Sequence, residues 1–166
     1  MTRVEELVEL LHLKPHPEGG FFRENYRSER YIPEDALPQG YGGTRNHSTA
    51  IYFLLPATTF SAWHRINQDE VWHHYEGGTI RIHLISVIGT YACVEVGPDL
   101  KKKQEFQVII PGQTWFACEV LDQDYALAGC TVAPGFSFAD FELPTRQQLV
   151  HRFPQHAEII TRLTHE

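Results

Sequence analysis

The sequence predicts an all-β fold, either a sandwich or a barrel, with helices confined to the two ends of the chain. Short segments rich in apolar, β-branched and aromatic residues recur between residues 47 and 133 at intervals of roughly 8–12 residues. Gly, Pro, Asn or Asp separates each segment from the next, and these residues favour turns. Helical patterns occur only near the termini, which argues against a parallel sheet with crossover helices.

The strands expected from this pattern begin after an amphipathic N-terminal segment. Residues 31–46 are rich in Pro and Gly, so we expect a long loop there, and loops of this length often bind ligands. The expected strands are residues 21–26, 47–55, 59–66, 70–76, 79–86, 90–96, 106–110, 114–121 and 125–133.

Both ends of the chain carry helix signals. Residues 2–11 place apolar side chains on one stripe, and Thr2 with Glu5 forms a potential capping box. Thr145 and Gln148 repeat that box at the start of a helix expected to reach residue 153. Residues 155–163 are expected to add one or two further turns.

The composition is that of a single globular domain spanning residues 1–166. A net charge of −7 argues against nucleic acid or an anionic membrane as a partner. We find no apolar stretch of the roughly 18 residues that a membrane span needs, and no signal peptide. The three cysteines form no CxxC pair, so free thiols and a cytoplasmic location are expected.

Residues 60–84 hold four of the ten histidines: His64, His73, His74 and His83. We interpret this stretch as three paired strands with turns at residues 67–69 and 77–78. A hairpin centred on Asn67 would place His64 opposite Glu70, on one face of the sheet. The sequence therefore predicts a His64–Glu70 pair inside the fold, with about 2.6–3.2 Å between heavy atoms.

An imidazole oriented by a carboxylate suits proton abstraction from a carbon next to a carbonyl, as in epimerases and isomerases. Tyr52 and Tyr75 are candidates for the general acid. A His–Glu hydrogen bond that only satisfies two polar groups within the sheet is an equally good interpretation.

A metal site is the less favoured alternative. His64 and Glu70 could supply two ligands, but Glu70 and His74 lie four residues apart on one strand, or ~13 Å between Cα atoms. A third ligand would have to come from a distant residue such as His83 or His47. We therefore expect no bound metal and no cofactor.

Aromatic and polar residues of the expected strands are candidates for a ligand pocket, since such pockets are mostly apolar with a few polar groups. The loop from His16 to Gly20 is a further candidate, although its Pro and Gly residues also suit a simple turn. The predicted ligand-binding residues are Arg23, Tyr52, Trp63, Trp72, His74, Arg81, His83, Trp115 and Phe116.

Several stretches resemble the cupins. Glu70 followed after six residues by Gly77 is similar to the second half of the first cupin motif, and Pro111 to the start of the second. Longer stretches at residues 13–28, 47–55, 60–78, 111–120 and 129–143 resemble the cupin_5 (DUF985) subfamily. The resemblance implies a double-stranded β-helix (jelly roll), a homodimer, and a ligand pocket in the barrel for a small molecule such as a sugar or nucleotide sugar.

The chain departs from the cupin pattern at two positions. Ile66 and Phe116 stand where the motifs have metal-binding histidines. Three functional classes follow: a metal-independent epimerase or isomerase, a non-catalytic protein that binds a small ligand, and, third, a metal-dependent cupin enzyme.

Overall fold

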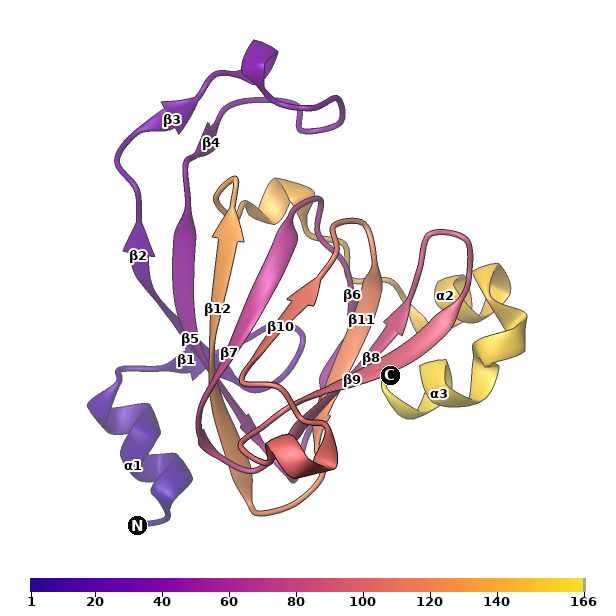
Figure 1. Ribbon diagram of the computed structural model, residues 1–166. Helices are drawn as coiled ribbons and strands as arrows, with labels where there is room; N and C mark the ends of the chain where they lie inside the picture. Colours follow the sequence, from indigo (N-terminus) through magenta and orange to yellow (C-terminus); the bar gives the residue numbers. More distant parts are fainter. Residues whose placement is uncertain (166) are drawn as a thin grey trace.

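The computed structural model describes residues 1–165 and consists mainly of two antiparallel β-sheets that face each other (Figure 1). Their inner faces share one hydrophobic core, in which Phe53 and Trp72 of the larger sheet meet Ile82 and Phe116 of the smaller one. The predicted all-β fold is confirmed, and the expected strands form with shifts of at most two or three residues at their ends.

The larger sheet has six strands and the smaller has four. In spatial order the larger sheet contains β1 (Lys14–Pro15), β2 (Phe21–Arg27), β5 (Thr49–Pro56), β12 (Tyr125–Ala133), β7 (Asp69–Gly77) and β10 (Gln107–Ile110). The smaller sheet contains β6 (Ser61–His64), β11 (Trp115–Val120), β8 (Ile80–Ile85) and β9 (Tyr91–Val96).

The connections around β7 differ from the prediction. β6 pairs with β11, whereas β7 pairs with β10 and β12, so β6 and β7 belong to different sheets. The turns at residues 67–69 and 77–78 therefore carry the chain from one sheet to the other and close no hairpin. The alternation of polar and apolar residues along the sequence predicts where strands lie, but it does not identify the partner of each strand.

Residues 31–46 are more ordered than the predicted loop. They form an arm of two short strands, β3 (Tyr31–Ile32) and β4 (Arg45–Asn46), with a 3₁₀ turn, η1 (Glu34–Ala36), between them. In Figure 1 this arm projects beyond the ends of β2 and β5.

Helices occupy the two ends of the chain, as predicted. Capping boxes begin α1 (Arg3–Leu10) at Thr2 and α2 (Arg146–Arg152) at Thr145. α1 packs on the larger sheet, while α2 and α3 (Ala157–Arg162) cover the smaller one around Trp63 and Trp115. The short 3₁₀ turns are η2 (Leu100–Lys102), η3 (Phe138–Asp140) and η4 (Pro154–His156). Within residues 1–165, no helix has the length and apolar character needed to cross a membrane.

The buried carboxylate of Asp140 ties three segments together. It accepts hydrogen bonds from Nε and Nη2 of Arg45 at 2.8 and 2.7 Å. It also accepts from Nε2 of Gln68 at 2.8 Å and from Nδ2 of Asn67 at 3.1 Å. One side chain thereby joins the arm, the turn between β6 and β7, and the segment that follows β12.

Replacing Asp140 with Ala should destabilise the protein strongly, because Arg45 would remain buried with an unpaired charge. Loss of one partner of a buried pair typically costs about 3–5 kcal/mol. The matched control is Glu95→Ala, which removes the more exposed Arg81–Glu95 pair, and such pairs contribute about 0–1 kcal/mol. Urea unfolding measures both, and equal losses of stability would contradict the structural role of Asp140.

Candidate active site

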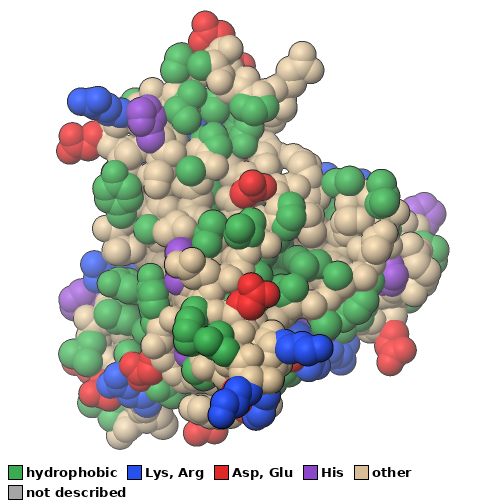
Figure 2. All heavy atoms as spheres, in the orientation of Figure 1, with side chains coloured by type: hydrophobic (Ala, Val, Ile, Leu, Met, Phe, Trp, Pro, Cys, Tyr) green, Lys and Arg blue, Asp and Glu red, His purple; other side chains and the backbone are tan. Residues whose placement is uncertain are grey.

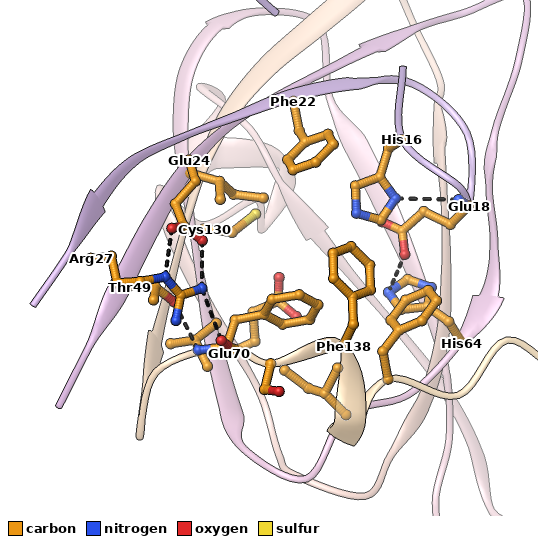
Figure 3. A pocket seen from close by; sticks show the side chains of 16 residues that line it. His16, Glu18, Phe22, Glu24, Arg27, Thr49, His64, Glu70, Cys130 and Phe138 are labelled. Atoms are coloured by element: carbon orange, nitrogen blue, oxygen red, sulfur yellow. Dashed lines mark hydrogen bonds and ion pairs between the residues drawn. The ribbon is translucent and has the colours of Figure 1, made fainter. Parts of the chain in front are cut away.

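The site is a cavity of about 110 Å³ between the two sheets, lined from both sides. Most of its wall is apolar and includes Phe22, Ile51, Ile66 and Val132. Two groups of polar side chains lie at opposite ends of the cavity, and Glu70 and Ser137 complete the polar lining (Figure 3). His16, Glu18 and His64 form one group, and Glu24, Arg27 and Thr49 form the other.

A tight loop before β2 inserts Glu18 into the barrel. The Glu18 carbonyl accepts a hydrogen bond from the Ala62 N–H at 2.7 Å, which fixes the loop against β6. Gly19 has φ of +116°, and a Cβ there would lie 2.1 Å from the Phe60 carbonyl oxygen. Only glycine fits this close approach of two backbones, so Gly19 allows the loop to pack against β6 with the Glu18 side chain in the cavity.

Glu18 and His64 form a buried ion pair. Nε2 of His64 lies 2.8 Å from Oε2 of Glu18, and Nδ1–H donates to the Ala62 carbonyl at 2.7 Å. Burial alone would lower the pKa of His64, but the nearby Glu18 carboxylate outweighs it and raises that pKa. Burial alone would raise the pKa of Glu18, and the charge of His64 reverses this and lowers it. His64 is therefore an imidazolium held by a carboxylate.

His16 has the opposite protonation state. The Glu18 backbone N–H donates to Nδ1 of His16 at 3.2 Å, so this nitrogen carries a lone pair and the proton resides on Nε2. The Glu18 carboxylate is 3.5 Å from the same nitrogen, too far for a hydrogen bond. Burial lowers the pKa of His16; the charge of Glu18 opposes this effect and the charge of His64 adds to it. In Figure 3 the Nε2 side of this neutral ring faces the cavity.

Glu70, on β7, is the third carboxyl group that lines the cavity, after Glu18 and Glu24. Its side chain is 9% exposed, and burial raises its pKa to about 7. The charge of His64 lowers this pKa and the charge of Glu18 raises it, so all three groups share one electrostatic environment. A carboxyl group that is half-ionised near neutral pH can both accept and donate a proton there.

An aromatic rim borders the cavity on the side of the segment that follows β12. Phe136, Phe138 and Phe141 pack edge to face with ring centroids 5.0–6.3 Å apart. The backbone of Phe136 is fixed from both sides, because its N–H donates to Thr49 Oγ1 and its carbonyl accepts from Arg27. The entrance is therefore apolar and anchored to the larger sheet.

The predicted His64–Glu70 hydrogen bond is wrong, because both ring nitrogens of His64 contact Glu18 and Ala62 instead. β6 and β7 lie in different sheets, so His64 and Glu70 are not cross-strand neighbours. Both nevertheless line the same cavity, since facing sheets send their inner side chains into a common space.

The other predicted ligand-binding residues do not line this cavity. Trp72 and Phe116 belong to the adjoining core, and the Phe116 ring lies 4.0 Å from that of His64. Trp63 and Trp115 pack under the C-terminal helices, and Tyr52 packs on the α1 side.

The remaining polar candidates have structural partners elsewhere. Arg23 donates to the Leu11 carbonyl at the end of α1, and Nε2 of His74 contacts the Gly78 carbonyl at 3.0 Å. Arg81 pairs with Glu95, while His83 contacts Tyr91 and Glu119. These four side chains are thus hydrogen-bonded to other parts of the protein, outside the cavity.

The residues present do not fit a metal ion of the kind that cupin motifs bind. Ile66 and Phe116 are buried at two ligand positions, and His64 is occupied through both ring nitrogens. Within residues 1–165, no group of three or more His, Cys, Asp or Glu side chains is arranged to hold a metal.

Sequence reasoning placed His16 and Glu18 in a candidate loop but gave them no role, and it missed Glu24, Arg27 and the aromatic rim. The available signals were the two glycines after Glu18, which indicate a constrained loop, and the three phenylalanines between residues 136 and 141. Nothing in the local pattern shows that these segments meet.

The family profile described as "Cupin superfamily (DUF985)" matches residues 5–144. The chain belongs to this cupin family. It is 30% identical over 150 residues to an uncharacterised protein of Saccharomyces cerevisiae, covering 84% of this chain and 74% of that protein. Family membership supports the fold and brings no established reaction with it.

Solved structures agree with the family assignment. A hypothetical protein from Leishmania major is 31% identical with a TM-score of 0.89, and each chain is covered to 98%. A protein from Shewanella oneidensis is 32% identical with a TM-score of 0.87, and each chain is covered to 99%. Oxalate decarboxylase from Bacillus subtilis shares only the fold: one structure is 15% identical with a TM-score of 0.55, over 90% of this chain and 36% of that one.

Glu70 should make the protein less stable as pH rises from 5 to 8. Because its folded pKa of about 7 exceeds the value of 4.5 for an unperturbed Glu, the unfolded state ionises first and stability falls until about pH 7. The fall attributable to this group is on the order of 3 kcal/mol. Glu70→Gln should remove it, as measured by urea unfolding at pH 5 and 8.

The control for this experiment is Glu76→Gln on the same strand. Arg3 and Tyr125 lower the pKa of the more exposed Glu76 to about 2, so it is ionised in both states above pH 5. Its replacement should leave the pH dependence between 5 and 8 unchanged. If Glu70→Gln retains the full pH dependence of the parent protein, Glu70 does not titrate near neutral pH.

Glu18→Gln should lower the pKa of His64 more than Glu70→Gln does. Glu18 contacts the imidazolium directly, whereas Glu70 acts only through its charge at longer range. NMR titration of the His64 ring in the parent and both variants measures the two shifts. A larger decrease in Glu70→Gln would restore Glu70 as the main partner of His64.

Proposed function

We propose that the cavity catalyses proton transfer at a carbon next to the carbonyl group of a small molecule, as in an isomerase or epimerase. The observation that carries this proposal is Glu70, a carboxyl group in an apolar cavity whose pKa is about 7. Such a group matches the requirement for a general base at neutral pH.

The roles in this reaction follow from protonation states. The Glu70 carboxylate accepts the proton from the carbon, and the electron pair of the C–H bond moves to form an enolate. The negative charge develops on the carbonyl oxygen, where Nε2–H of His16 donates a hydrogen bond. A neutral imidazole donor beside a glutamate base is an established combination for this chemistry. Glu70 then returns its proton to the same carbon, the carbonyl re-forms, and the protein regains its starting state. In an α-hydroxy carbonyl compound the proton can instead go to the neighbouring carbon, provided that the hydroxyl proton moves to the first carbonyl oxygen and the new carbonyl forms at the hydroxyl-bearing carbon.

The Glu18–His64 pair supports this arrangement through its charges. The imidazolium lowers the pKa of both Glu70 and His16, and the Glu18 carboxylate opposes both effects. A change in the position of the Glu18–His64 pair would change the protonation of both Glu70 and His16. His64 and Glu18 are therefore positioning residues in this proposal.

A cavity that only binds a small ligand is the second candidate function. Its apolar wall and aromatic rim are sufficient for binding without chemistry. The two functions differ in one respect: only the first requires Glu70 to exchange a proton with a bound carbonyl compound.

The predicted homodimer, cytoplasmic location and small-molecule partner remain proposals. The larger sheet exposes Tyr26, Tyr75 and Ile109, which a second copy could cover. Figure 2 shows hydrophobic side chains across the middle of one face with acidic groups among them, and basic groups mostly toward its margins. This mixture supports the expectation that nucleic acid is not a partner.

Glu70→Gln should reduce proton exchange by about 100-fold or more, the usual contribution of a general base. The assay is the loss of the α-C–H signals of acetophenone, dihydroxyacetone and glyceraldehyde in D₂O, followed by ¹H NMR. Wild-type exchange should rise with pH through about 7 as Glu70 ionises. Glu76→Gln is the control and should exchange at the wild-type rate. If a ketone binds but exchanges no faster than in buffer, catalysis is disproved and only the binding function remains.

A further inference from the structure

The cations that line the cavity are already committed to other groups. Nε and Nη2 of Arg27 donate to the two carboxylate oxygens of Glu24, both at 2.7 Å. Nη1 donates to Asn46 Oδ1 at 2.7 Å, and Nη2 also donates to the Phe136 carbonyl at 3.0 Å. His64 is held at both ring nitrogens, as described above. An incoming phosphate or carboxylate would have to compete with Glu24 for the Arg27 guanidinium and with Glu18 for the His64 imidazolium.

The acidic groups make an anion still less favourable. Glu18, Glu24 and Glu70 all line the cavity, against one arginine and one imidazolium. A buried anion without a partner is expensive, and Glu70, which has no ion-pair partner, adds repulsion when it is ionised. The cavity therefore selects against phosphates and carboxylates.

An organic cation is the serious competitor, because Glu70 is a carboxyl group without an ion-pair partner and the rim is aromatic. Two features oppose it. The His64 imidazolium is close enough to Glu70 to act on its charge, so a second cation beside Glu70 would be repelled. The donor side of His16, Nε2–H, also faces the cavity and offers nothing to an ammonium group.

The cavity has hydrogen-bond donors that suit an uncharged acceptor. Nε2–H of His16 and, when protonated, the hydroxyl of Glu70 can each donate to a carbonyl oxygen. Four phenylalanines, Phe22, Phe136, Phe138 and Phe141, surround the space available to the rest of the ligand. A cavity of about 110 Å³ that opens at an aromatic rim suits a compact ring or short chain.

We propose that this cavity takes a small uncharged carbonyl compound with an apolar or aromatic body, and that it rejects the phosphorylated and carboxylated analogues of such a compound. This inference deepens the proposed function by naming the class of substrate. It favours a simple aldehyde or ketone over a nucleotide sugar, whose diphosphate would need free cations.

Three probes of nearly equal size test the charge preference: acetophenone, benzoate and benzylammonium. Their affinities are measured with the wild-type protein at pH 7.5 by NMR chemical-shift titration. Acetophenone should bind at least tenfold more tightly than either ion. Tighter binding of benzoate, tighter binding of benzylammonium with proton release by Glu70, or no binding of acetophenone would each overturn the inference.

Two exposed phenylalanines provide a matched test of location. Phe138 lies in the rim and is 56% exposed, whereas Phe106 is 52% exposed and does not line the cavity. Phe138→Ala should weaken acetophenone binding on the order of fivefold, the usual value of an aromatic contact, and Phe106→Ala should leave it unchanged. Equal effects would place the probe outside the cavity.

Glu70→Gln separates this inference from the proposed reaction. The amide retains a donor and the shape of the carboxyl group, so acetophenone should bind within about threefold of the wild-type affinity. Normal binding without any catalysed exchange in the wild type would disprove the reaction and leave the ligand class intact. Catalysed exchange together with a preference for benzoate would support the reaction and disprove the proposed ligand class.

Discussion

The site depends on the burial of two opposite charges between the sheets. Taking Glu18 or His64 out of water singly would be costly, and at 2.8 Å each offsets that cost for the other. The pair requires the loop before β2 to press against β6, which in turn requires glycine at residue 19. A backbone constraint outside the sheets thus determines the protonation of His16, His64 and Glu70.

Most of the fold could be predicted from local pattern. Turn residues and apolar alternation located the main strands, and the Thr2 and Thr145 capping boxes located α1 and α2. Strand partners could not be predicted, because a jelly roll passes the chain between sheets through turns whose composition also suits hairpins. The pairing of β6 with β11 therefore separated His64 from the strand of Glu70.

The site was predictable only in part for the same physical reason. His64 and Glu70 stand out because titratable residues in apolar strands are unusual, and both do line the cavity. Glu18 lies 46 positions before His64 in the sequence, and nothing local indicates their contact. The polar strand residues Arg23, His74, Arg81 and His83 looked equally suitable, but each satisfies a neighbouring backbone or side-chain group.

The connection between β6 and β7 has a consequence for how such proteins diversify. His64 and Glu70 line the cavity from opposite sheets, yet they are separated by only the short connection that crosses between those sheets. Inserting or deleting one residue there would shift one wall against the other while each sheet kept its own ladder. Selection could then alter which molecules the barrel accepts by changing the length of one turn, provided that Asn67 and Gln68 kept their hold on Asp140.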